Sequence, residues 1–153
     1  LWRCEEYTIE FTVVNMHLKC CGDGLYRRKQ SMKQLHSILK DRVDSGKDNI
    51  LVICYWNDEI QDRGIYQSFG VFIDDVNRFR FATELIVEDE QQQSYPSWPS
   101  FLDHILIGSG FFKSFESGGE IRSVNLDKWM GSWEKYENLV SDHRPILLSL
   151  PLE

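Results

Sequence analysis

The sequence lacks any apolar run near the roughly 20 residues that a membrane-spanning helix needs, so we expect no membrane span. It also lacks an excess of positive charge, because 17 lysines and arginines stand against 24 aspartates and glutamates, for a net charge of −7. That balance argues against a protein held on nucleic acid by bulk positive charge. The negative net charge is still compatible with an enzyme that binds a phosphate in one small pocket, where a metal ion supplies the positive charge.

Cysteine is scarce, with four residues in the chain, and no second pair stands at the spacing of a zinc site. Cys54 lies in an apolar run and is expected to be a buried thiol. The pairing of Cys4, Cys20 and Cys21 stays open, because four cysteines permit three connectivities. Localisation is undetermined as well, since the chain opens at Leu1 without Met and any export signal would lie upstream.

The composition that is present, 42% apolar and 27% charged, is that of a soluble globular protein, and we expect a single domain over residues 1–153. Alternation predicts a strand over residues 8–15, with Ile9, Phe11 and Val13 on one face. Apolar positions three and four apart predict a helix over about 26–43, with a basic outer face that includes Arg27 and Arg28. A continuous apolar run predicts a strand over residues 50–56 that is covered on both faces. Strand, helix and strand in this order favour a layered α/β fold.

The second half of the chain is less regular. Residues 70–73 and 79–83 each fit a short strand or a buried loop, and strands are expected over 101–107 and 145–150. A short helix is expected within residues 129–139. The tryptophans are expected to pack in the core or in loops rather than to serve as stacking platforms; they are Trp2, Trp56, Trp98, Trp129 and Trp133.

Four polar clusters stand at the ends of the expected strands. A carboxylate binds a hard divalent cation, a histidine takes a proton from water, a second carboxylate orients that histidine, and neutral donors hold phosphate oxygens. If these groups converge at one edge of a sheet, they could together catalyse hydrolysis of a phosphoester. The clusters are Asn15-Met16-His17, Asn57-Asp58, Asp103-His104 and Ser141-Asp142-His143.

The order and content of these clusters resemble the endonuclease/exonuclease/phosphatase superfamily, the DNase I-like phosphoesterases. The matching segments are residues 14–19, 53–58, 100–106 and 141–145, and Ser-Asp-His before a terminal apolar strand is the most specific. The resemblance implies half of a four-layer α/β sandwich, with a mixed sheet and flanking helices. It also implies hydrolysis of a phosphoester, in a nucleic acid or a small phosphodiester, with Mg²⁺ or Mn²⁺ as cofactor.

The resemblance assigns roles by position in the motifs. It implies that His143 is the general base and that Asp103 orients it. It also implies that Asp142 helps to bind the metal and that Asn15 and His17 contact the scissile phosphate. Asn57 would bind the phosphate or the attacking water. His104 follows the motif but is expected to have a structural role in the fold.

Two departures from the family pattern favour an alternative function. Tyr55 stands where the family has an essential carboxylate, and a phenol with a pKa near 10 stays neutral at pH 7. The family's domain runs to roughly 250–300 residues, so the chain is expected to be truncated at its N-terminal side. The missing half carries a metal-binding glutamate, for which Glu5 and Glu6 stand at no matching spacing. The alternative is a catalytically inactive binding or assembly module on the same scaffold.

The missing half also affects packing. In a sheet-on-sheet fold the inner face of each sheet is apolar, and half a sandwich would leave several hundred Å² of it exposed to water. We therefore expect a second copy, or a separate N-terminal half, to cover that face.

Overall fold

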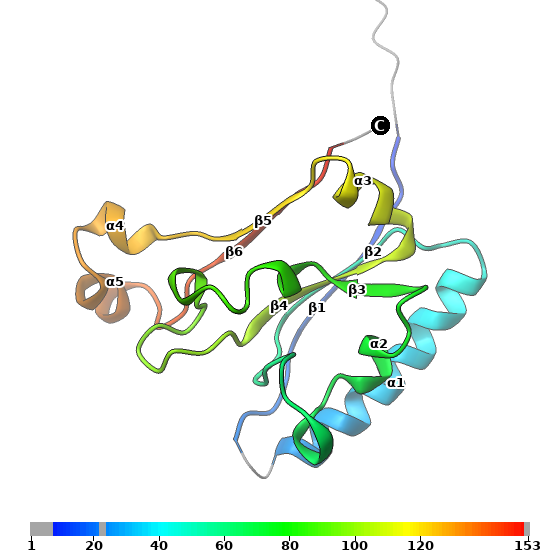
Figure 1. The fold of residues 1–153 in the computed structure, drawn as a ribbon, viewed down its shortest axis with the longest axis horizontal. Helices are drawn as coiled ribbons and strands as arrows, with labels where there is room; N and C mark the ends of the chain where they lie inside the picture. The colour runs from blue at the N-terminus through cyan, green and yellow to red at the C-terminus, as the bar shows by residue number, and fades with distance from the viewer. Residues whose placement is uncertain (1–7, 22–23, 152–153) are drawn as a thin grey trace, which may run out of the picture.

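The structure, a computed structural model, describes residues 8–21 and 24–151 (Figure 1). The expected positions Trp2, Cys4, Glu5 and Glu6 lie outside these residues. The strands are β1 (Thr12–His17), β2 (Ile50–Tyr55), β3 (Phe79–Phe81), β4 (Asp103–Gly108), β5 (Glu120–Ser123) and β6 (Ile146–Ser149). The α-helices are α1 (Leu25–Asp44), α2 (Gly70–Ile73), α3 (Phe112–Glu116), α4 (Leu126–Met130) and α5 (Trp133–Leu139). Short 3₁₀ turns occupy Gly64–Tyr66, Ala82–Leu85, Glu90–Gln92 and Ser109–Phe111.

Two sheets organise these elements. The larger has the order β1-β2-β4-β3, in which β1 and β2 are parallel and the other pairs are antiparallel. Strands β5 and β6 form a separate antiparallel pair. Figure 1 shows α1 and α2 on one side of the larger sheet and the β5–β6 pair on the other. The predicted α/β class with a mixed sheet and flanking helices is confirmed. Among the described residues, no helix has the length and apolar character needed to cross a bilayer.

Helix α1 covers the first face of the larger sheet. Its apolar positions Met32 and Leu39, two turns apart, are buried against a core that includes Val52 of β2 and Leu106 of β4. The helix predicted over residues 26–43 is therefore confirmed. The expectation that Arg28 lies on its solvated face is wrong, because Arg28 is buried and its Nε donates to Asp58 Oδ2 at 3.0 Å.

The second face of the larger sheet is only partly covered. Ile121 of β5 and Ile146 and Leu148 of β6 pack over the buried Ile105 and Ile107 of β4. Nearer the free edge strand β1, a row of apolar side chains stays exposed. This open patch consists of Phe11, just ahead of β1, Val13 and Ile53.

The structure differs from several of the elements predicted from the sequence. The strand predicted over residues 50–56 exists as β2, but it is not covered on both faces, because Ile53 belongs to the open patch. The first strand begins at Thr12 rather than residue 8 and extends to His17. Residues 70–73 form helix α2 instead of a strand or loop, and β5 was not predicted from the sequence. Of the described tryptophans, Trp56 is fully buried, whereas Trp98 and Trp129 are 76% and 90% exposed, which contradicts a packing role for those two.

Candidate active site

The candidate site lies where three strands of the larger sheet meet one edge. Parallel strands β1 and β2 both end there, and the antiparallel β4 begins there. The register aligns His17, Tyr55 and Asp103 in one cross-strand row, with Asn15 and Ile53 in the next row on the same face. Side chains alternate between faces along a strand, so this row lies on the face that carries the open patch.

His143 joins the row from the segment between α5 and β6. Its Nδ1 lies 2.6 Å from Asp103 Oδ2, and both side chains are partly buried. The backbone of His143 is fixed on both sides: its N–H donates to Ser141 Oγ at 3.0 Å, and its carbonyl accepts from the Tyr136 hydroxyl at 2.9 Å. Burial lowers the pKa of His143, but the Asp103 carboxylate, with help from Asp142, outweighs burial and leaves that pKa above its usual 6.5.

Tyr55 fills the centre of the site. Its ring centroid lies 4.7 Å from that of His17 and 4.5 Å from that of His143, and Tyr95 stacks on the other side of His143 at 4.9 Å. Burial first, then the negative charges of Asp103 and Asp142, raise the pKa of Tyr55 to about 12. The phenol is therefore neutral at pH 7, and it contributes a ring and a hydroxyl to the site.

The remaining predicted residues lie around this centre. Asn15 and Asp103 line one hollow of about 230 Å³ together with Arg144. Asn57 has a left-handed backbone (φ 56°), and its Nδ2 donates to the Leu18 carbonyl at 2.7 Å, just beyond the end of β1. Asp142 is exposed beside His143. The structure thus brings His17, Tyr55, Asp103 and His143 into direct contact and sets Asn15, Asn57 and Asp142 at the margin.

His104 belongs to the opposite face and to the core. Its ring nitrogens lie 3.1 Å from Thr83 Oγ1 and 3.1 Å from the Asp58 carbonyl. Since a carbonyl only accepts, Nε2 carries the proton, and Nδ1 accepts from Thr83. Full burial lowers the pKa of His104 to about 4. His104 is therefore a neutral, hydrogen-bonded core residue, as expected from the sequence.

Two residues that hold the site carried no signal in the sequence. Ser94 is buried, and its Oγ accepts hydrogen bonds from the backbone N–H groups of Leu102 and Asp103, which fixes the start of β4. The Ser94 carbonyl accepts from the N–H of Arg144 at 2.8 Å, so the same residue also positions the segment after His143. Tyr95 follows it and stacks on His143. Both stand in a polar loop whose long-range contacts leave no periodic pattern.

The described residues do not fit a divalent cation on their own. Within residues 8–21 and 24–151 there is no group of three or more His, Cys, Asp or Glu side chains placed to hold one. Asp103 is engaged by His143, and the neutral Tyr55 cannot balance a cation's charge. Asp142 remains as a single exposed carboxylate.

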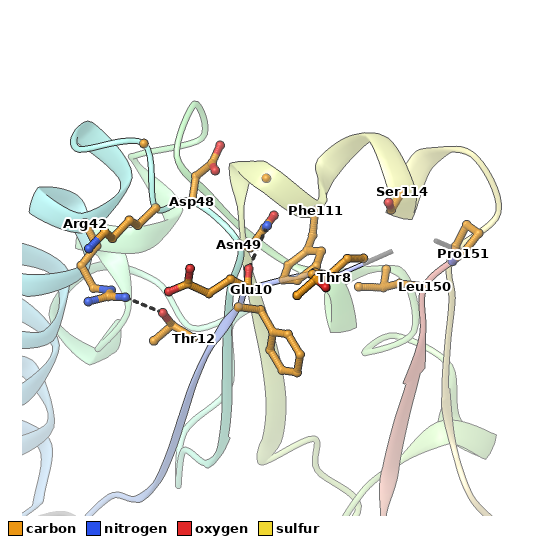
Figure 2. Close-up of a pocket in the computed structure, with 15 residues that line it drawn as sticks. Thr8, Glu10, Thr12, Arg42, Asp48, Asn49, Phe111, Ser114, Leu150 and Pro151 are labelled. Atoms are coloured by element: carbon orange, nitrogen blue, oxygen red, sulfur yellow. Dashed lines mark hydrogen bonds between the residues drawn. The ribbon is translucent and has the colours of Figure 1, made fainter. Parts of the chain in front are cut away.

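A second cavity, of about 360 Å³, lies at the opposite end of β1 (Figure 2). Arg42 reaches into its wall, where Nη2 donates to Thr12 Oγ1 at 2.7 Å, and Asn49 Nδ2 donates to the Glu10 carbonyl at 3.1 Å. The first bond ties the start of β1 to the end of α1, and the second ties the segment ahead of β1 to the residue before β2. The cavity is thus separated from the candidate site by the length of the strand.

Comparison with known proteins supports the fold. The human nocturnin catalytic domain, solved with a bound sulfate anion, superposes with a TM-score of 0.56 at 18% sequence identity. The match covers 91% of this chain and 47% of that one, so the chain spans about half the length of the solved domain. No protein-family model matches, and no curated protein matches. The likeness confirms the predicted DNase I-like α/β fold.

Proposed function

We propose that this chain carries the proton-transfer part of a phosphoester hydrolase site. The observation that supports the proposal best is the 2.6 Å contact between His143 Nδ1 and Asp103 Oδ2. With Nδ1–H donated to the carboxylate, Nε2 is left to accept a proton from water. The carboxylate then stabilises the imidazolium that forms, as in other acid-oriented histidines.

Polar side chains near this pair suit a phosphate. The amide of Asn15 shares a hollow with Asp103, and the His17 ring lies against Tyr55, whose ring also contacts His143. In the proposed reaction these groups hold the phosphate oxygens, and Asn57 steadies the neighbouring turn through Leu18. The nocturnin domain was solved with sulfate, a tetrahedral anion of similar shape. Mg²⁺ or Mn²⁺, implied by the resemblance, has no fitting ligand group among the described residues, so every proposed step uses side chains of this chain.

A second candidate is an inactive binding module, and Tyr55 is the observation that favours it. A neutral ring packed between His17 and His143 occupies the centre of the site, where the resemblance expects a charged carboxylate. Loss of one member of a catalytic set commonly costs several orders of magnitude in rate. In this function the pocket holds a phosphate group without cleaving it.

One experiment separates the two functions. Hydrolysis of bis(4-nitrophenyl) phosphate is measured with and without Mg²⁺ for the parent chain, His143→Ala, Tyr55→Asp and a control, His36→Ala. His36 is a matched control because its Nε2 pairs with Asp75 Oδ2 at 2.9 Å on the helix-covered side. The hydrolase predicts parental turnover that falls at least about 100-fold in His143→Ala and is unchanged in His36→Ala. If both the parent and Tyr55→Asp are inactive while the parent still binds inorganic phosphate in calorimetry, the binding module is favoured.

We also propose that the open patch is covered in the assembled protein, by a second copy or by a separate N-terminal half. Support comes from the exposure of Phe11, Val13 and Ile53 on one face of the larger sheet, because isolated soluble domains seldom leave a large apolar area exposed to water.

A further inference from the structure

Two adjacent cysteines lie in the loop that leaves the candidate site. Cys20 and Cys21 follow β1 three and four residues after His17, and their Sγ atoms lie 2.8 Å apart. Cys20 is half-buried and Cys21 is exposed. The Cys20 sulfur is close enough to Tyr55 for its charge to contribute to the raised pKa of that phenol. The pair is therefore both reachable from solvent and adjacent to the centre of the site.

Hydrogen bonds from outside the loop fix the backbone of residues 18–21. The Leu18 N–H donates to the Tyr55 carbonyl at 3.0 Å, and Arg28 Nη1 donates to the carbonyls of Lys19 at 2.8 Å and Cys21 at 3.2 Å. Arg28 is itself fixed by Asp58. A Cβ on Gly24 would lie 2.5 Å from the Lys19 carbonyl oxygen, so the chain returns tightly against the loop. The backbone that carries the two cysteines is therefore anchored by Tyr55 and Arg28.

Cys21 has a left-handed backbone, with φ at 69°. A residue other than glycine seldom adopts this region, which persists where surrounding contacts enforce it. The Cys21 carbonyl accepts hydrogen bonds from Arg28 and from the Gly24 N–H in this conformation. In the same conformation the two sulfurs lie 2.8 Å apart.

We propose that Cys20 and Cys21 are a reversible oxidation site that closes into a vicinal disulfide with an oxidised low-molecular-weight disulfide such as glutathione disulfide. The thiolate of one cysteine attacks a sulfur of glutathione disulfide, which releases one glutathione thiol and leaves a mixed disulfide. The second cysteine attacks the protein sulfur of that mixed disulfide and releases the second glutathione thiol. Two cysteines lose two electrons and two protons, and one glutathione disulfide becomes two thiols.

The same geometry makes the bond easy to reverse. Neighbouring Cα atoms are about 3.8 Å apart, less than the roughly 4.4 Å lower limit of ordinary disulfides. Strained and exposed disulfides are the readily reduced, regulatory class. Closing the ring re-orients the peptide between the two cysteines, so it competes with the Arg28 bond to the Cys21 carbonyl. The oxidation site does not depend on whether the neighbouring pocket is catalytic.

The sequence provides a clean test by peptide mass. Trypsin cleaves after Lys19 and Arg27, which releases a peptide of residues 20–27 that contains these two cysteines and neither Cys4 nor Cys54. The folded chain is fully reduced, treated with glutathione disulfide, alkylated with iodoacetamide, and digested. We expect the 20–27 peptide to lose two hydrogen atoms, to escape alkylation, and to become alkylatable again after dithiothreitol. The Cys54→Ser variant, a matched control, should behave identically.

Single variants distinguish a vicinal disulfide from simple thiol reactivity. In Cys20→Ser and Cys21→Ser we expect the remaining cysteine to carry one glutathione instead of losing hydrogen. Phenylarsine oxide, which bridges two close thiols, should bind one equivalent in the parent chain and in Cys54→Ser, and none in either single variant. The proposal is overturned if the parent's 20–27 peptide carries two glutathiones, stays alkylatable after oxidation, or is cross-linked to the peptide that contains Cys4.

Discussion

The two faces of the larger sheet differ most clearly at Asp103 and His104, which are consecutive in the chain. Strand geometry turns them to opposite sides. His104 enters a dry, aromatic core in which Phe101 stacks on it at 5.3 Å, whereas Asp103 faces the candidate site and pairs with His143. One Asp-His dipeptide thus supplies a core residue and a site residue.

The comparison extends to two histidines with opposite electrostatic environments. His104 has neutral partners and complete burial, and its pKa falls to about 4. His143 is also desolvated, but a carboxylate 2.6 Å away reverses the balance and raises its pKa above 6.5. The surroundings of His104 therefore disfavour its charged form, whereas the Asp103 carboxylate stabilises the charged form of His143. This contrast is what a proton-transfer site needs from its scaffold.

The largest expected effect tests the neutrality of His104. Its folded pKa is depressed, so its native interactions contribute fully above the unfolded pKa of 6.5 and are lost as pH falls from 6.5 towards 4. A depression of this size corresponds to about 3 kcal/mol. In urea unfolding, the stability advantage of the parent over His104→Phe should shrink by about that amount between pH 7 and pH 4.

An NMR titration of the ring protons of His104 measures the pKa of this residue directly. We expect them to stay at the neutral-imidazole shift down to about pH 5. A midpoint near 6.5 would contradict the assignment of His104 to a dry core.

The next effect compares the same substitution on the two faces. Val52 of β2 is fully buried beneath α1, and Val13 of β1, 48% exposed, belongs to the open patch. Val52→Ala should cost about 2–3 kcal/mol of unfolding free energy, because it leaves a cavity as well as losing apolar burial. Val13→Ala should cost less than about 1 kcal/mol. Urea unfolding at pH 7 measures both.

Substitutions at the same two positions test whether the open patch is covered. If a second copy binds there, light scattering of the parent should give a mass above the 18.1 kDa of one chain, and Val13→Gln should lower it. Val52→Ala, at a concentration where it remains folded, should leave the mass unchanged. A folded parent of 18.1 kDa at all concentrations would contradict coverage by a second copy.

Patterns within one strand or helix could be predicted from the sequence, whereas contacts between residues far apart in the chain could not. A strand turns successive side chains to opposite faces, so a strand predicted over residues 101–107 is enough to place Asp103 and His104 on opposite sides, and the spacing of Met32 and Leu39 is enough to predict α1. The helical pattern alone predicts a solvated Arg28, because its partner Asp58 lies 30 residues away. No periodic pattern could reveal that contact.

Short segments and loop residues were harder still. The four apolar residues of α2 suit a strand as well as a helix, and only packing decides between them. Ser94 positions Asp103 through a bond across nine residues of irregular loop, and Tyr95 stacks on His143 from a distant part of the chain. Their roles follow from the tertiary structure, which single-residue chemistry does not specify.

The smallest expected effect concerns the pair on the site face. In Asp103→Asn the main group that raises the pKa of His143 is removed, so burial dominates and that pKa should fall below 6.5 in an NMR titration. The parent's raised pKa means that the ion pair contributes fully below pH 6.5 and is lost as pH rises through the folded pKa. Asp103→Asn should therefore be less stable than the parent by on the order of 1 kcal/mol at pH 5.5 and by less at pH 8.5.

Because the Arg144–Asp127 pair, with Nη2 and Oδ2 3.2 Å apart, contains no histidine, Asp127→Asn serves as the control and should give a stability loss that is the same at both pH values. A loss in Asp103→Asn that is equally independent of pH would show that Asp103 stabilises the fold without setting the protonation of His143.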